Sequence, residues 1–170
     1  MIIRPVTAYD ARHIREISSD ISVRKSMNIS QAGFTDAENL IKNLTELDHL
    51  LVLETEMEPV EICGVVLLRV DPQIYLRRQA TLEIMMGTKW QGQGLGKALM
   101  MAALELADKE LMLERIEVEI AIDNLNALKL CKSMGFKVEG TAKDWAVSDD
   151  GNYIDAYLLE RCRHHHKYQK

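Results

Sequence analysis

The sequence is short of cysteine and of positive charge and has no long apolar run, and each shortage excludes a class of protein. Its three cysteines form no Cys-x-x-Cys pair, which is typical of free thiols in a reducing compartment. No apolar run approaches the roughly 20 residues that cross a bilayer, and no basic region followed by an apolar signal core stands at the N-terminus. We therefore expect a soluble, cytoplasmic protein that does not contact a membrane.

Positive charge is also in the minority. The chain has 21 Lys and Arg against 26 Asp and Glu, a formal net charge of −5. This balance speaks against nucleic acid as the main partner, because nucleic-acid-binding proteins gain affinity by neutralising phosphates with Lys and Arg. With 170 residues, 47% of them hydrophobic, the chain has the size and composition of one domain with its own core.

Hydrophobic periodicity and turn residues divide the chain into alternating strands and helices. The predicted strands are Ile2 to Val6, Leu50 to Thr55, Glu61 to Val70, Ala80 to Met86, Arg115 to Ile122, Phe136 to Ala146 and Asn152 to Arg161. The predicted helices are Ala8 to Ser19, Asp36 to Leu47, Gly94 to Lys109 and Asn124 to Met134. Met27 to Thr35 and Asp149 to Asn152 have the composition of turns. This order predicts an α/β (α+β) fold with a mixed, mostly antiparallel sheet of about seven strands and four flanking helices.

A glycine-rich loop is the most informative feature. The strand Ala80 to Met86 leads into Gly92, Gly94 and Gly96, which run directly into an Ala/Leu/Met-rich helix. Such a loop presents bare backbone N–H groups at a positive helix N-terminus, which is the arrangement that holds phosphate.

The glycine spacing excludes two common phosphate loops. A Walker loop would need glycine at Gln91 and a hydroxyl residue at Ala98, and a dinucleotide loop would need glycine at Lys97. Gln91-x-x-Gly94-x-Gly96 instead matches the Arg/Gln-x-x-Gly-x-Gly/Ala signature of the GNAT superfamily of N-acetyltransferases.

Further segments carry the same resemblance over nearly the whole chain. The run from Asn124 through Ala127 to Gly135-Phe136 resembles the family's Asn-x-x-Ala to Gly-Phe segment, and Ile3-Arg4-Pro5 resembles its first strand. The resemblance implies one GNAT domain over residues 1–163, followed by a basic tail at 164–170. The C-terminal strands are similar to those of bacterial members that act on amino acids, polyamines and other small amines.

The resemblance also implies which residues bind acetyl-coenzyme A. The loop would hold its pyrophosphate, the main chain at the end of the preceding strand would pair with the pantetheine arm and stabilise the oxyanion, and Asn124 would hold a pantetheine amide. The expected cofactor-binding residues are Ile84, Met85, Met86, Gln91, Gly92, Gln93, Gly94, Leu95, Gly96, Lys97 and Asn124. Asn124 can equally be the N-cap of the helix that follows it.

Two strand carboxylates are candidates for the general base that deprotonates the acceptor amine. Glu83 has apolar neighbours on both sides, and burial would raise its pKa, so it is preferred over Glu119. The alternative is structural: Glu117 and Glu119 share one face of an alternating strand, as in any half-solvated strand.

Cys131 departs from the family pattern, in which a tyrosine at the matching position protonates the leaving thiolate. The thiol could replace the tyrosine as general acid, be a small buried hydrophobe, or form an acetyl-enzyme, for which no activating neighbour is visible. The tail's consecutive histidines, His164 to His166, lack metal-ligand spacing, so no metal is expected.

The sequence therefore predicts an acetyl-CoA-dependent N-acetyltransferase that acts on a small-molecule amine by direct attack. The acidic surface is compatible with a cationic amine. An acetyltransferase of protein N-termini or ribosomal proteins is one alternative, and a non-catalytic coenzyme A-binding sensor is another. A homodimer is the expected assembly.

Overall fold

The computed structural model of the chain describes residues 1–27, 32–56, 58–73, 76, 78–148 and 150–163. Seven strands form one sheet in the order β1-β2-β3-β4-β5-β7-β6. Their bounds are β1 (Ile2–Pro5), β2 (Asp48–Glu54), β3 (Ile62–Val70), β4 (Gln79–Met86), β5 (Arg115–Ala121), β6 (Lys137–Val147) and β7 (Tyr153–Cys162). All neighbouring pairs are antiparallel except β4 and β5. The predicted mixed, mostly antiparallel sheet is confirmed.

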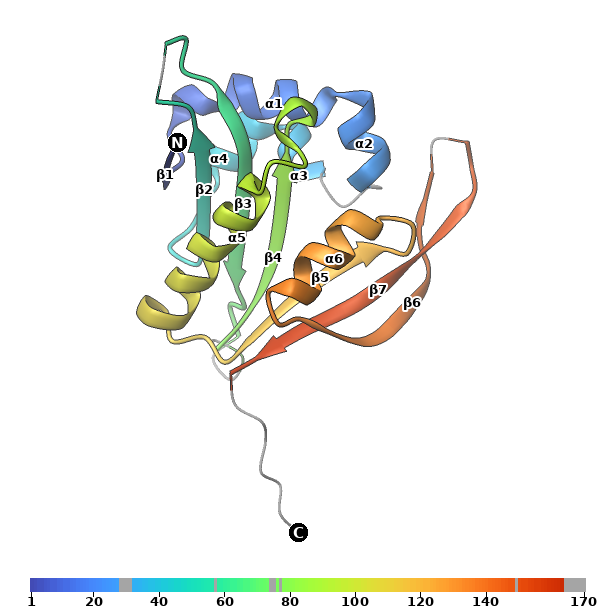
Figure 1. Cartoon of the computed structure of the whole chain (residues 1–170). Helices are drawn as coiled ribbons and strands as arrows, with labels where there is room; N and C mark the ends of the chain where they lie inside the picture. Colours follow the sequence, from blue (N-terminus) through green and yellow to red (C-terminus); the bar gives the residue numbers. More distant parts are fainter. Residues whose placement is uncertain (28–31, 57, 74–75, 77, 149, 164–170) are drawn as a thin grey trace.

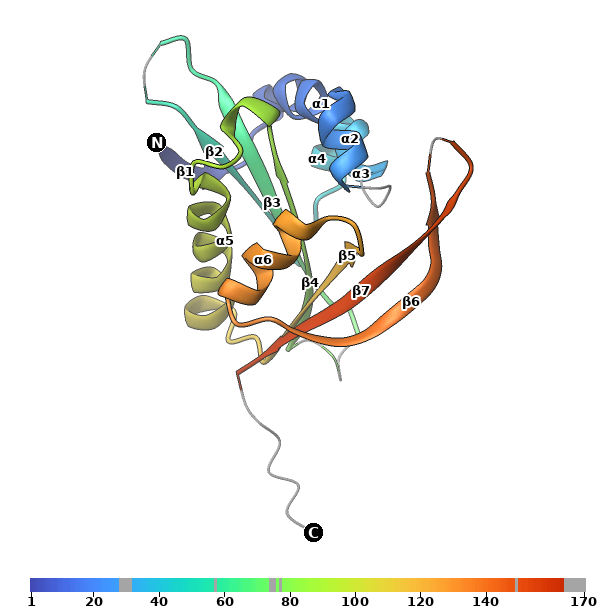
Figure 2. The same cartoon turned by 45° about the vertical axis from the view of Figure 1, so that its right-hand side comes forward.

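Helices cover both faces of the sheet (Figures 1 and 2). One face carries α1 (Ala11–Ser19), α2 (Ile21–Met27), α3 (Ala32–Thr35) and α4 (Ala37–Lys42), which share a buried apolar cluster with the sheet. The other face carries α5 (Leu95–Glu105) and α6 (Leu125–Ser133), with a separate cluster between them and the sheet. No helix among the described residues is long and apolar enough to cross a membrane.

The predicted number of four helices is wrong, because α2 and α3 lie between the first two predicted helices. Asp20 begins α2: its carboxylate accepts the N–H groups of Ser22 at 2.7 Å and Val23 at 3.4 Å, which satisfies the first turn as an N-cap does. α3 lies within the predicted turn Met27 to Thr35, of which residues 28–31 are outside the described part. The predicted helix Asp36 to Leu47 is shorter than expected, since α4 ends at Lys42.

The two parallel strands at the centre of the sheet separate after three residue pairs. Gln79, Ala80 and Thr81 of β4 pair with Arg115, Ile116 and Glu117 of β5. Beyond them β4 stays with β3 as far as Met86, whereas β5 follows β7 as far as Ala121. The sheet therefore opens between β4 and β5 toward the C-terminal ends of both strands.

A bulge distorts β6 next to this opening. Ala142 pairs with Ala156 but Ala146 pairs with Ile154, so β6 carries two more residues than β7 between these pairs. Asp144 has a φ of 51°, and its N–H donates to the carboxylate of Asp155 at 3.0 Å. The bulge lets the strand turn one side chain, Trp145, toward the opening.

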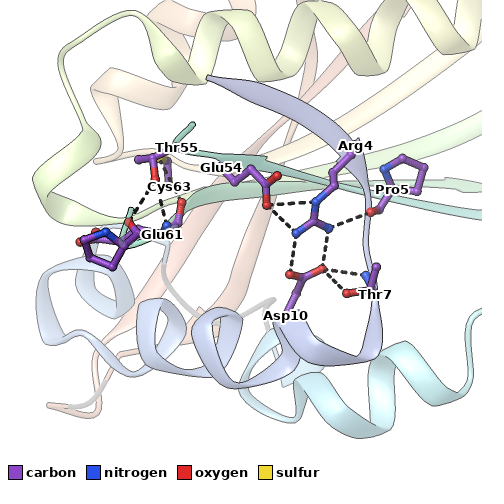
Figure 3. A network of polar contacts seen from close by, with 9 residues as sticks. Arg4, Pro5, Thr7, Asp10, Glu54, Thr55, Glu61 and Cys63 are labelled. Carbon is purple, nitrogen blue, oxygen red and sulfur yellow. Dashed lines mark hydrogen bonds and ion pairs between the residues drawn. The ribbon is translucent and has the colours of Figure 1, made fainter. Parts of the chain in front are cut away.

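Arg4 joins the first strand to its surroundings (Figure 3). Its guanidinium forms two hydrogen bonds to Asp10, at 2.8 and 2.9 Å, and two to Glu54, at 3.0 and 2.6 Å. Asp10 also accepts the N–H and hydroxyl of Thr7 in a capping box. This network fixes the edge strand β1 to the start of α1 and to β2.

Candidate active site

A cleft of about 220 Å³ occupies the opening between β4 and β5. Because side chains alternate along a strand, β4 and β5 present different residues to its two sides. Leu82, Ile84, Val118 and Ile120 belong to the cluster beneath α5 and α6. The full lining is Thr81, Leu82, Glu83, Ile84, Glu117, Val118, Glu119, Ile120, Ala121, Asn124, Ala127, Leu130, Cys131 and Trp145. The cleft thus passes through the sheet, with an apolar side at α6 and an acidic side on the opposite face.

Glu83 is half-buried on the acidic side. Burial raises the pKa of its carboxyl; the positive charge of Arg69 opposes the shift and the negative charge of Glu119 adds to it. Its carboxylate makes no hydrogen bond or ion pair with any described residue. A carboxylate in this setting can accept a proton from a bound ligand.

Glu119 is exposed at the same side and is already engaged. The indole Nε1–H of Trp145 on β6 donates a hydrogen bond to the carboxylate of Glu119 on β5 at 2.8 Å. Glu117, also on the acidic side, pairs with Arg115 at 2.6 Å. The two predicted bases therefore lie in one cleft, but only Glu83 has a carboxylate free of a described partner.

Cys131 lines the cleft on the α6 side and is only 1% exposed. Burial raises the pKa of its thiol to about 12, and no charge contributes to the shift. The thiol therefore stays protonated at neutral pH and has no activating neighbour among the described residues. An acetyl-enzyme would need an activating base or cation beside the thiol, and no charged group acts on Cys131 among the described residues.

The glycine loop lies at the end of β4, outside the cleft. Gly92 and Gly94 have φ values of 73° and 79°, and nothing lies within 4 Å of a Cβ placed on either. Gly94 is the N-cap of α5, and the first helical hydrogen bond runs from the N–H of Ala98 to its carbonyl at 3.2 Å. The N–H groups of Leu95, Gly96 and Lys97 precede that bond, so they are left for an outside acceptor. The open space beside these two glycines and the three free N–H donors fit a pyrophosphate.

Gln91 shapes this loop with its side chain. Its Nε2 donates to the carbonyl of Met86 at 3.0 Å, which ties the loop back to the last residue of β4. The neighbouring amide of Gln93 donates to the carbonyl of Lys89 at 2.8 Å. Both glutamine amides are therefore used inside the loop, which leaves the backbone to bind a ligand.

The strand edge between the loop and the cleft suits an added strand. The N–H of Gly87 donates to the carbonyl of Cys63 at 2.9 Å, and since successive residues direct their N–H groups to opposite edges, Ile84 and Met86 direct theirs toward β5. No β5 residue pairs with them. Met85 directs its N–H toward β3, and its side chain is 1% exposed in the opposite cluster. Of the three predicted main-chain positions, Ile84 and Met86 therefore direct an N–H toward the cleft, whereas Met85 does not.

Asn124 both lines the cleft and caps α6. Its side-chain oxygen accepts the N–H of Ala127 at 3.1 Å. The capping interpretation is thus observed, and it fixes the side chain at the C-terminal end of β5, beside the cleft.

Sequence reasoning missed Arg69 as a part of this site, and it gave Trp145 no role of its own within the segment Trp145 to Tyr153, where the family resemblance implies acceptor specificity. Nothing local marks them, because Trp145 depends on a bulge in β6 and Arg69 acts on Glu83 from β3. Within the described residues no group of three or more His, Cys, Asp or Glu is placed to hold a metal ion. The histidines at 164–166 lie outside the described residues.

The chain is similar in sequence to a named enzyme. A curated relative, the L-amino acid N-acetyltransferase AaaT of Escherichia coli (strain K12), is 37% identical over 98 residues, which cover 56% of this chain and 60% of that protein. The chain thus spans less than two thirds of that relative's length.

Two solved structures share the fold. Ribosomal-protein-alanine N-acetyltransferase from Brucella melitensis has a TM-score of 0.81 at 22% identity, covering 95% of this chain and 99% of the other. Spermidine N-acetyltransferase from Vibrio cholerae in complex with CoA and spermine has a TM-score of 0.79 at 22% identity, covering 95% and 94%. A model of the acetyltransferase (GNAT) domain matches residues 1–137, and the chain therefore belongs to the GNAT acetyltransferase family.

Proposed function

We propose that the protein transfers an acetyl group from acetyl-coenzyme A to the primary amine of a small molecule by direct attack. One observation carries the proposal: a half-buried carboxylate without a described partner, Glu83, lies in the same cleft as the unpaired edge of β4. The names of two relatives, an amino acid acetyltransferase and a spermidine acetyltransferase, support a small-molecule acceptor.

The backbone and the strand edge position the acetyl donor. The N–H groups of Leu95 to Lys97 bind the pyrophosphate, and the edge formed by Ile84 and Met86 aligns the pantetheine arm as an added strand. Acetyl-coenzyme A supplies the thioester carbonyl when bound. An N–H of Ile84 or Met86 then donates to the carbonyl oxygen as negative charge develops on it.

Glu83 activates the acceptor. Its carboxylate takes a proton from the ammonium, directly or through one water, and the amine nitrogen forms the new C–N bond to the carbonyl carbon. The C–S bond breaks, the sulfur leaves as a thiolate, and the nitrogen of the new amide loses its second proton to water. The raised pKa of Glu83 brings its basicity closer to neutral pH than that of an ordinary glutamate.

Cys131 does not protonate the leaving thiolate in this mechanism. Because burial raises the pKa of its thiol to about 12, proton transfer from Cys131 to a thiolate with a pKa near 8.5 is unfavourable. The thiolate takes its proton from water.

The test is thiol release by the purified protein from acetyl-coenzyme A, measured against a panel of amines and amino acids, with mass spectrometry of the acetylated product. We expect amine-dependent release above the rate of thioester hydrolysis. Tight coenzyme A binding without release for any acceptor would favour the non-catalytic sensor. Release with an N-terminal alanine peptide alone would favour the protein acetyltransferase.

A further inference from the structure

The acceptor side of the cleft is acidic. Glu83, Glu117 and Glu119 line it together, and the fourteen described residues of the lining include no Lys, Arg or His. A ligand that enters from this side meets carboxylates and no counter-charge on the wall itself.

Three cations on strands of the sheet, Arg69, Lys143 and Arg115, are each held by carboxylates. Arg69 donates to Asp48 at 2.7 Å, and Lys143 pairs with Asp155 at 2.6 Å. Arg115 pairs with Glu117 at 2.6 Å and with two further glutamates. The charge of Glu117 is therefore compensated, whereas the partner of Glu119 is a neutral indole N–H.

Trp145 fixes the position of the Glu119 charge. The bulge in β6 is anchored by Asp155, which accepts the N–H of Asp144 at 3.0 Å and the ammonium of Lys143 at 2.6 Å. From this anchored backbone the indole reaches across to Glu119 at 2.8 Å. The carboxylate is thus oriented in the cleft wall without being neutralised.

We propose that Glu119, positioned by Trp145, is the specificity-determining residue of the acceptor site and selects primary amines that carry no carboxylate beside the nitrogen. This inference rests on the proposed acetyl transfer and narrows its acceptor class. In an α-amino acid the carboxylate is bonded to the carbon that bears the nitrogen, so an amine presented to Glu83 would bring its carboxylate into the same acidic wall. Juxtaposed like charges in such a site are strongly unfavourable. The chain would then differ in acceptor from its relative named for L-amino acids.

The experiment uses matched acceptor pairs that differ only in the carboxylate. These are phenylalanine with 2-phenylethylamine and methionine with 3-(methylthio)propylamine, with phenylalaninamide as a control that lacks the carboxylate. The rate constant kcat/KM is compared at equal concentration of free amine. We expect each decarboxylated amine to exceed its amino acid by about tenfold or more, and the amide to behave like the amines.

Two variants test the residues. Glu119→Gln removes the charge and keeps the shape of the side chain, so the ratio of kcat/KM for the amine to kcat/KM for the amino acid should fall at least about threefold. Trp145→Phe removes the N–H donor to Glu119 and should also lower this ratio. Glu105→Gln is the matched control, because it removes one exposed carboxylate from α5, where Glu105 pairs only with Lys109 among the described residues, and it should leave the ratio unchanged.

The outcomes separate the inference from the proposed function. Amino acids acetylated as well as their decarboxylated partners, or an unchanged ratio in Glu119→Gln, would overturn the inference while acetyl transfer stands. Absence of thiol release with every acceptor would overturn both. A lower ratio in Glu119→Gln together with a tenfold preference for amines in the parent protein supports the assignment.

Discussion

Replacement of Glu83 by glutamine tests the proposed mechanism most directly. An alkyl ammonium has a pKa near 10.4, roughly 3.4 units above pH 7, so forming the free amine at pH 7 costs about 4.6 kcal/mol. General bases contribute about 10² to 10⁴ in rate. We therefore expect Glu83→Gln to lower kcat/KM by about 10² to 10³ at pH 7 for an alkylamine. Near pH 10 much of the amine is already free, so the loss should shrink to less than about tenfold.

The assay is thiol release from pH 6.5 to 10 with a saturating donor. In the parent protein the acidic limb of the profile should lie above the usual pKa of a glutamate, because burial raises the pKa of Glu83. For an acceptor whose α-amino group has a pKa near 8, Glu83→Gln should lower kcat/KM by at most about tenfold, since little deprotonation is needed.

Glu119→Gln is the control, because that carboxylate is exposed and engaged by Trp145. It should show no loss that shrinks at high pH for alkylamines, and the acidic limb of its profile should move to lower pH, because the charge of Glu119 adds to the raised pKa of Glu83. An equal loss for Glu83→Gln at every pH, or a larger pH-dependent loss in Glu119→Gln, would refute the assignment of Glu83 as the base.

Three further changes probe the loop, the thiol and the fold. Gly94→Val should weaken coenzyme A binding at least about tenfold by calorimetry, because it adds bulk at a φ of 79°, whereas Gly151→Val, at a φ of 83° in the hairpin tip, should not; equal affinity in both variants contradicts the cradle. Cys131→Ala should keep acetyl transfer with intact protein mass, and an acetylated Cys131 after mixing with acetyl-coenzyme A alone would contradict direct attack. Asp10→Asn should lower the free energy of unfolding by about 2 kcal/mol at pH 7, the range of hydrogen bonds to a charged group. Burial pushes the pKa of Asp10 up, but the hydrogen bonds from Arg4 and Thr7 outweigh it and hold the pKa below its ordinary value. The stabilisation is therefore present above about pH 4 and lost as the pH falls, so denaturation curves of parent and variant should converge at acidic pH, and parallel curves would contradict this account.

The sequence predicted all seven strands, because turn residues and short apolar runs mark them locally. The prediction was wrong for two helices: it missed α2 and placed the end of α4 too late. α2 was missed although Asp20 precedes it as an N-cap, since its seven residues are too few for a clear helical period. The helix predicted from Asp36 was too long, since α4 ends at Lys42. The apolar residues Leu44 and Leu47 continue the helical spacing beyond that point, but they pack against the buried clusters from outside the helix.

The main-chain positions in the site show a second limit of sequence reasoning. Ile84, Met85 and Met86 look equivalent in the sequence, as three apolar residues at the end of one strand. Only the register with β3, fixed by the bond from Gly87 to Cys63, directs Ile84 and Met86 toward the cleft and Met85 away from it. Strand alternation predicts that neighbours differ, but the pairing partner decides which of them faces the site.

The choice between Glu83 and Glu119 depends on contacts that no local pattern contains. Both are carboxylates in apolar strands, and both reach the same cleft because β4 and β5 separate after Thr81 and Glu117. The difference arises 26 positions further along the chain, where two extra residues in β6 bring the indole of Trp145 to Glu119. That donor holds one carboxylate in the wall, and burial in the open sheet raises the pKa of the other. In our proposal, the same separation of strands admits the pantetheine arm and leaves Glu83 as the carboxylate that accepts the proton.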